Sequence, residues 1–133
     1  MASKTRILLV DDEASVLKVV KRRLETVGYD VSTAMDGQEG LQKAVTEKPD
    51  LIITDIMMPV MDGYTMVTKL RAEPTCARIP VIVLSAKDQM KDLFLFKGIK
   101  DCDYIVKPFI SEELLTHIEK LLARVQTYLP PSS

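Results

Sequence analysis

Five polar residues of this chain each come at or near the end of a short apolar run. They are Asp11, Asp12, Asp55, Ser85 and Lys107. Ionised carboxylates about 4 Å apart repel by roughly 4 kcal/mol per pair at a surface-like dielectric, so three acids held together call for a cation. Oxygen ligands select a hard metal, and Mg²⁺ readily takes phosphate oxygens as further ligands. A carboxylate beside such a metal can attack phosphorus, while an ammonium and a hydroxyl hold the transferred oxygens.

The apolar runs predict the strands that must position these side chains. Residues 6–10, 51–54 and 81–84 are almost continuously apolar, as are strands that are buried on both faces. Residues 29–34 alternate apolar and polar side chains, and residues 104–106 form a short last run, which suits strands at the edges of a sheet. Because the carboxyl ends of parallel strands meet at one edge of a sheet, we expect the five polar side chains to lie close together.

The segments between the strands carry the apolar stripes and capping residues of helices. The expected caps are Asp36 (in a capping box with Glu39), Asp62, Asp88 and Ser111. Strands that alternate with helices predict an α/β fold, a doubly wound five-stranded parallel sheet with right-handed crossovers. With the three most buried strands at the centre, the strand order is 2-1-3-4-5, which is the flavodoxin-like (βα)5 arrangement. No glycine-rich phosphate loop follows a strand, which disfavours nucleotide-binding versions of this architecture.

Length and charge exclude several other classes of protein. The 133 residues fit one domain, predicted as residues 1–126, followed by a tail or linker start at 127–133. The chain has 18 basic and 19 acidic residues, and the resulting net charge of −1 predicts neither a nucleic-acid surface nor a membrane anchor. The first residues lack a signal peptide's apolar core, so a cytoplasmic location is expected. Cys76 and Cys102 have neither metal-site nor redox spacing and are predicted to be free thiols, and His117 is predicted to be a plain surface residue.

Four motifs in order resemble the receiver (phosphoacceptor) domain of the two-component response regulator family, including its single-domain chemotaxis-type members. They are Leu9-Val-Asp-Asp12, Asp55 with Met58-Pro-Val-Met-Asp-Gly63, Pro80-Val-Ile-Val-Leu-Ser-Ala86 and Lys107-Pro-Phe109, and the likeness covers residues 5–126. It implies that Asp55 accepts a phosphoryl group from a phosphohistidine. The donor would be a sensor histidine kinase or a histidine phosphotransfer protein.

The resemblance also implies a role for each site residue. Asp12, Asp55 and the backbone carbonyl of Met57 would bind Mg²⁺, and Asp11 would act mainly through a bound water. Lys107, Ser85 and the backbone at Met57 and Ala86 would hold the phosphoryl group, and the side chains of Met57 and Lys87 would modulate its loss. The Lys107–Pro108 peptide would be cis.

In this family the signalling hydroxyl moves onto the phosphoryl group and an aromatic residue swings inward, so Ser85 and Tyr104 are the expected switch pair. The signal would leave through the fourth helix, fifth strand and fifth helix to a downstream protein partner or effector, and a homodimer could use the same face. Such a chain is not an enzyme, because it catalyses only its own phosphoryl transfer and dephosphorylation.

Two departures from the family pattern and two alternatives accompany this interpretation. Lys100-Asp101 replaces the usual Gly-Ala pair, which predicts a different local backbone, and the run Leu93–Phe96 is too apolar for one core-facing stripe. Some of that run should face outward. The patch as a whole could serve either to fill the core or to bind a partner. A pseudo-receiver would lack an acid or the lysine, whereas an aspartate-nucleophile phosphatase would carry a second acid where Met57 stands. Taken singly, the acids could cap helices, and Lys107, Ser85 and Tyr104 could be ordinary surface, turn and strand residues.

Overall fold

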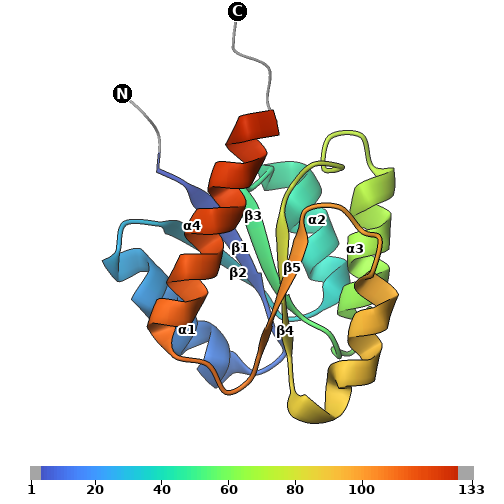
Figure 1. The fold of residues 1–133 in the computed structure, drawn as a ribbon, viewed down its shortest axis with the longest axis horizontal. Helices are drawn as coiled ribbons and strands as arrows, with labels where there is room; N and C mark the ends of the chain where they lie inside the picture. The colour runs from blue at the N-terminus through green and yellow to red at the C-terminus, as the bar shows by residue number, and fades with distance from the viewer. Residues whose placement is uncertain (1–3, 129–133) are drawn as a thin grey trace, which may run out of the picture.

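The computed structural model describes residues 4–128, and within them the chain forms five strands, four α-helices and one 3₁₀-helix (Figure 1). In chain order these are β1 (Arg6–Val10), α1 (Ala14–Thr26), β2 (Asp30–Ala34), α2 (Gly37–Glu47), β3 (Leu51–Asp55), α3 (Gly63–Ala72), β4 (Val81–Ser85), the 3₁₀-helix η1 (Lys87–Phe96), β5 (Cys102–Val106) and α4 (Ser111–Tyr128). Strands and helices therefore alternate along the described chain, as predicted.

The five described strands form one parallel sheet in the order β2-β1-β3-β4-β5, which confirms the predicted topology. Every residue of β3 and β4 is buried, whereas β2 and β5 are only partly buried, so the apolar runs did identify the central strands. Asp55 pairs with Leu84 and Ser85 pairs with Val106. This register makes β3, β4 and β5 end at nearly the same level, so their last side chains share one edge of the sheet.

Two hydrophobic cores lie on opposite faces of the sheet, because successive side chains of a strand point to opposite sides. Figure 1 shows α1 and α4 on one face and α2, α3 and η1 on the other. Leu24 of α1 and Ile118 of α4 pack with Ile53 on the first face. Leu70 of α3 and Phe96 of η1 pack on the second face. These helices fix the sheet from both sides and leave the edge formed by the strand ends for polar residues.

The segment after β4 differs most from the prediction. It forms a 3₁₀-helix along its whole length, although such helices rarely exceed a few residues. The predicted cap, Asp88, lies inside its first turn, and Ala86 occupies the cap position instead. Within the apolar run, Phe96 is buried and stacks edge-on against Tyr64, whereas Phe94 is 73% exposed. The run therefore divides between core and surface.

The other predicted helix caps are confirmed in part. Asp36 and Asp62 accept hydrogen bonds from the third backbone amides of α2 and α3, as expected. The Glu39 side chain bonds the amide of Met35 and not that of the cap residue, and Ser111 is the first residue of α4 and not its cap. Strand β5 starts at Cys102, two residues before the predicted run.

Several smaller expectations can be read directly from the structure. The Lys107–Pro108 peptide is cis, and Cys76 and Cys102 are free thiols within the described residues. The left-handed residues before β5 are Gly98 and Asp101, with φ of 95° and 55°, so Asp101 supplies a turn that does not need glycine at position 100. The prediction for His117 was incomplete, because its Nδ1 lies 2.9 Å from Asp103 Oδ2.

Two expectations concern the ends of the chain and the membrane. Helix α4 continues to Tyr128, past the predicted domain end at residue 126, and residues 129–133 of the predicted tail lie outside the described residues. Among the helices described between residues 4 and 128, none has the length and apolar character to cross a membrane.

Candidate functional site

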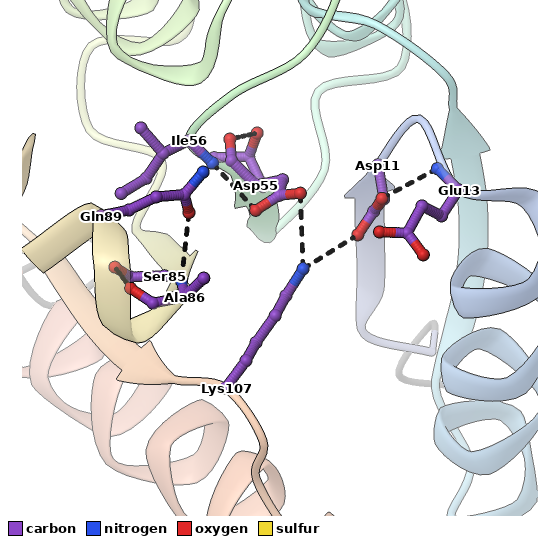
Figure 2. A network of polar contacts seen from close by, with 9 residues as sticks. Asp11, Glu13, Asp55, Ile56, Ser85, Ala86, Gln89 and Lys107 are labelled. Atoms are coloured by element: carbon purple, nitrogen blue, oxygen red, sulfur yellow. Dashed lines mark hydrogen bonds and ion pairs between the residues drawn. The ribbon is translucent and has the colours of Figure 1, made fainter.

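The ends of β1, β3 and β5 bring two acids and one lysine into direct contact (Figure 2). Lys107 Nζ lies 3.3 Å from Asp55 Oδ2 and 3.7 Å from Asp11 Oδ2. Strand β4 separates the strand of Lys107 from that of Asp55, so the ammonium reaches across one intervening strand end. The structure therefore places side chains from three strands in one ion-pair network, as the register of the sheet requires.

The three acids singled out in the sequence form one cluster. Asp11, Asp12 and Asp55 each have a carboxylate oxygen within 4.8 Å of the other two. Asp11 is fully buried and Asp55 is 7% exposed, whereas Asp12 faces solvent. Asp11 Oδ1 accepts a hydrogen bond from the Glu13 amide, but among the described residues Asp11 Oδ2 is buried without a hydrogen-bond partner. The Lys107 ammonium lies 3.7 Å from this oxygen, which is an ion pair and not a hydrogen bond. A buried carboxylate oxygen without a hydrogen-bond partner, beside two further acids, offers the oxygen ligands that a hard cation takes.

Burial dominates the electrostatics of this cluster. It raises the pKa of the Asp11 carboxyl above 3.8, against the lowering effect of the Glu13 amide bond, and the charge of Asp55 raises it further. Burial also raises the pKa of the Asp55 carboxyl above 3.8, and here the nearby Lys107 ammonium opposes the shift. Burial disfavours the ionised form of both carboxyls. A bound cation would stabilise that ionised form, because its charge compensates for the lost hydration.

The loop after β3 is packed directly against the backbone of Asp55. A β-carbon at Gly63 would lie 2.2 Å from the Asp55 carbonyl oxygen, so only glycine allows this approach. The Gly63 amide donates a 2.7 Å hydrogen bond to the Ile56 carbonyl, and the Ile56 amide donates to Asp55 Oδ1. The loop that begins α3 therefore fixes both the backbone and one carboxylate oxygen of Asp55.

On the other side of Asp55 from Asp11, the end of β4 holds two polar donors that are already engaged (Figure 2). The Ser85 hydroxyl donates to the carbonyl of Ala86 at 3.0 Å, and the Ala86 amide donates to Gln89 Oε1 at 3.0 Å. The Ala86 carbonyl also accepts the amide of Gln89 at 2.9 Å. Ser85, Ala86 and Gln89 thus form one hydrogen-bonded unit beside the acid cluster.

The remaining predicted site residues lie around this centre. The Met57 side chain is 55% exposed and follows Asp55 by two residues. Tyr104 is 51% exposed and borders a groove of about 710 Å³ between η1 and β5, whose lining includes Val83. The structure thus holds Tyr104 outward. The Lys87 side chain lies outside the described side chains.

The sequence reasoning missed the contact of Gln89 with Ala86. A usable signal was present, because glutamine at the third helical position reaches back to the amide of the cap residue in capping boxes. That signal is weak here because the cap position holds alanine, whereas the nearby Asp88 is the residue type that the sequence favours as a cap. The Glu13 amide, which binds Asp11, could not be found from a side-chain pattern, since it is a backbone group.

A doubly wound parallel sheet with an acid cluster and a lysine at its carboxyl edge is the arrangement of a phosphoacceptor domain. Similarity to known proteins assigns the chain to the same class. The family model of the response regulator receiver domain matches residues 7–119. The chain belongs to the receiver domain family of two-component response regulators, whose members take a phosphoryl group onto an aspartate.

Full-length regulators are among its relatives. The chain is 41% identical over 127 residues to the alkaline phosphatase synthesis transcriptional regulatory protein PhoP of Bacillus subtilis, covering 96% of this chain and 52% of PhoP. It is 43% identical over 122 residues to the transcriptional regulatory protein PrrA of Mycobacterium leprae, covering 92% and 52% of the two chains. The chain therefore spans about half the length of each of these relatives.

Solved structures of receivers agree closely in fold. The chemotaxis response regulator CheY4 of Vibrio cholerae superimposes with a TM-score of 0.82 at 33% identity, covering 90% of this chain and 99% of that one. The receiver domain of the sensor histidine kinase PA1611 of Pseudomonas aeruginosa superimposes with a TM-score of 0.82 at 31% identity, covering 91% and 99%. That second structure has a magnesium ion coordinated in its active-site cleft.

Proposed function

We propose that this chain receives a phosphoryl group on Asp55 from the phosphohistidine of a sensor histidine kinase or a histidine phosphotransfer protein. The contact of one lysine with two strand-end acids carries the proposal. An Asp55 oxygen bonds phosphorus as the nitrogen–phosphorus bond of the donor breaks, and the leaving nitrogen keeps the electron pair. The Lys107 ammonium stays beside the reacting carboxylate and balances the negative charge on the transferred oxygens.

The acid cluster fits Mg²⁺ in donor type and in its unsatisfied oxygen. Asp11, Asp12, Asp55 and the backbone carbonyl of Met57 would hold the ion, with Asp11 acting mainly through a water. When bound, the ion supplies positive charge next to the phosphoryl oxygens. Likeness to a receiver with magnesium in its cleft supports the same assignment.

The donors at the ends of β3 and β4 would hold the transferred group. In this proposal the Ser85 hydroxyl and the backbone amides of Met57 and Ala86 bind the phosphoryl oxygens. Movement of Ser85 is coupled to an inward swing of Tyr104, which is now half exposed beside the groove at η1. The altered surface of η1, β5 and α4 then controls a downstream protein partner or effector, or forms a homodimer.

The chain catalyses only its own phosphorylation and dephosphorylation and turns over no external substrate. Direct contact with nucleic acid or membrane forms no part of the proposal, because the charges nearly balance at −1. A domain that ends near residue 126 and a cytoplasmic location stay predictions from the sequence.

Labelling with a small acyl phosphate tests the proposal. The wild-type protein should incorporate close to one phosphoryl group per chain in Mg²⁺, and Asp55→Asn should incorporate none. Chelation of Mg²⁺ should stop wild-type labelling. Stoichiometric labelling of Asp55→Asn, or undiminished labelling in excess chelator, would contradict the phosphoacceptor or the metal assignment respectively.

A further inference from the structure

The backbone amide of Ala86 already has an acceptor, the side chain of Gln89. The distance from the Ala86 nitrogen to Gln89 Oε1 is 3.0 Å. Figure 2 shows Gln89, Ser85 and Ala86 together on the side of Asp55 opposite to Asp11. The amide carries one hydrogen and can make one good hydrogen bond. A phosphoryl oxygen on Asp55 could therefore bind this donor only after Gln89 Oε1 has left it.

We propose that Gln89 is a built-in competitor for the phosphoryl group. Its side-chain carbonyl occupies the Ala86 amide in the unphosphorylated chain and is displaced when Asp55 is phosphorylated. The proposal rests on the proposed function, since it takes Asp55 as the phosphoacceptor and the Ala86 amide as a phosphoryl ligand. Gln89 acts as a positioning residue, because it affects the reacting group only through the amide that it holds.

The exchange favours the phosphoryl group because of charge. Hydrogen bonds to an ionised acceptor are roughly twice as strong as those to a neutral amide oxygen. The neutral Gln89 carbonyl is therefore strong enough to satisfy the amide and weak enough to be replaced. Breaking its hydrogen bond still has a cost, which lowers the apparent affinity of the site for a phosphoryl group.

Displacement of Gln89 also connects the site to η1. The Ala86 carbonyl accepts both the Ser85 hydroxyl and the Gln89 amide, at 3.0 and 2.9 Å. Three hydrogen bonds join Ser85, Ala86 and Gln89, since the Ala86 amide also donates to Gln89 Oε1. If Ser85 turns towards the phosphoryl group while Gln89 Oε1 is displaced, two of these three hydrogen bonds at the start of η1 are lost. That helix is an unusually long 3₁₀ segment and carries the exposed Phe94. Release of Gln89 is thus a direct route from the phosphoryl group to the surface of η1.

A beryllofluoride titration in Mg²⁺, followed by amide resonances, tests this competition. Gln89→Leu removes the acceptor at similar size and should tighten the apparent beryllofluoride dissociation constant by about two- to tenfold, the range of one net hydrogen bond. Gln89→Glu gives the amide a charged acceptor and should weaken binding by a similar factor. Gln42→Leu and Gln42→Glu, at an exposed position of α2, are matched controls and should bind like the wild type.

The Ala86 amide proton supplies a readout that a purely structural role would not move. Without beryllofluoride it should resonate upfield and exchange faster in Gln89→Leu than in the wild type. At saturation the two proteins should give the same resonance, because the amide then serves the phosphoryl analogue in both. The wild type alone gives a second measurement: its Gln89 side-chain amide resonances should shift on saturation.

Each outcome has a defined meaning. Failure of the wild type to bind beryllofluoride would overturn the proposed function itself. The competition alone would be overturned if the wild type binds beryllofluoride normally and both Gln89 variants have dissociation constants within twofold of the wild-type value. The Ala86 resonance of free Gln89→Leu would then also match that of the free wild type. Should neither variant fold, wild-type Gln89 side-chain resonances that do not move on saturation would overturn it equally.

Discussion

The ammonium of Lys107 lies 3.3 Å from one carboxylate oxygen of Asp55, although the end of another strand separates the strands that carry them. Only a long side chain can cover that span. The same ammonium also lies 3.7 Å from buried Asp11, so one lysine is shared by two carboxylates whose ionised form is disfavoured by desolvation. Removal of the Lys107 ammonium should therefore affect both the stability of the fold and the rate of phosphoryl transfer.

Replacing Lys107 tests its role in charge neutralisation. Lys107→Gln should lower the rate of Asp55 labelling by an acyl phosphate about 100-fold, the usual effect of losing one donor aimed at developing negative charge. Lys120→Gln makes the same charge change on an exposed part of α4 and should label at the wild-type rate. Equal rates for Lys107→Gln and wild type would remove the lysine from the mechanism.

The raised pKa of Asp11 predicts a pH-dependent stability of the metal-free chain. Because the folded state holds the Asp11 proton more tightly than the unfolded state does, the contribution of this group to stability falls as pH rises from 3.8 through the folded pKa. Asp11→Asn should therefore be more stable than wild type at neutral pH in chelator, and this advantage should shrink towards pH 4.

Urea unfolding of both proteins in chelator, between pH 4 and pH 8, measures this difference. Addition of Mg²⁺ at neutral pH should reverse the order, since only the wild type keeps every acid of the cluster and binding to the folded state stabilises it. A wild type that is the more stable protein in chelator at neutral pH would contradict the raised pKa of Asp11.

Gly63 lets the loop before α3 approach Asp55, and a methyl group there should disturb the acceptor. Gly63→Ala should cost about 1–3 kcal/mol of stability, as overpacking does, and should also slow labelling because the Asp55 carbonyl must move. Gly28→Ala is the matched control, since its φ of 105° strains alanine but a β-carbon there meets no described atom within 4 Å. Gly28→Ala should lose stability, yet its folded state should be labelled at the wild-type rate. A wild-type labelling rate in Gly63→Ala would show that the close approach does not position Asp55.

The sheet and the strand-end acids could be predicted because both depend on patterns that the sequence displays. Buried strands need apolar runs, and the register of a parallel sheet then brings Asp55 and Lys107 to one edge whatever the loops do. The caps at Asp36 and Asp62 followed from residue type and spacing for the same reason. These features are local or topological and need no detailed geometry.

The segment after β4 could not be predicted in the same way. The continuous run Leu93–Phe96 gives no clear period that would distinguish a 3₁₀-helix from an α-helix. The packing of Phe96 against Tyr64 joins residues far apart in the sequence and could not be predicted from the run itself. The direction of the Ser85 hydroxyl depends on a backbone carbonyl that becomes available only in this turn. The left-handed Asp101 likewise reflects tertiary contacts, because the Arg71 guanidinium bonds the carbonyl of Lys100 at 2.9 Å.

Mapping the modified residue tests the account most directly. After labelling by an acyl phosphate in Mg²⁺, borohydride reduction of the aspartyl phosphate and mass analysis of the peptides should find homoserine at position 55. Homoserine at position 11 or 12, or an unmodified position 55 in fully labelled protein, would contradict the convergence of these residues on Asp55 as the reacting group.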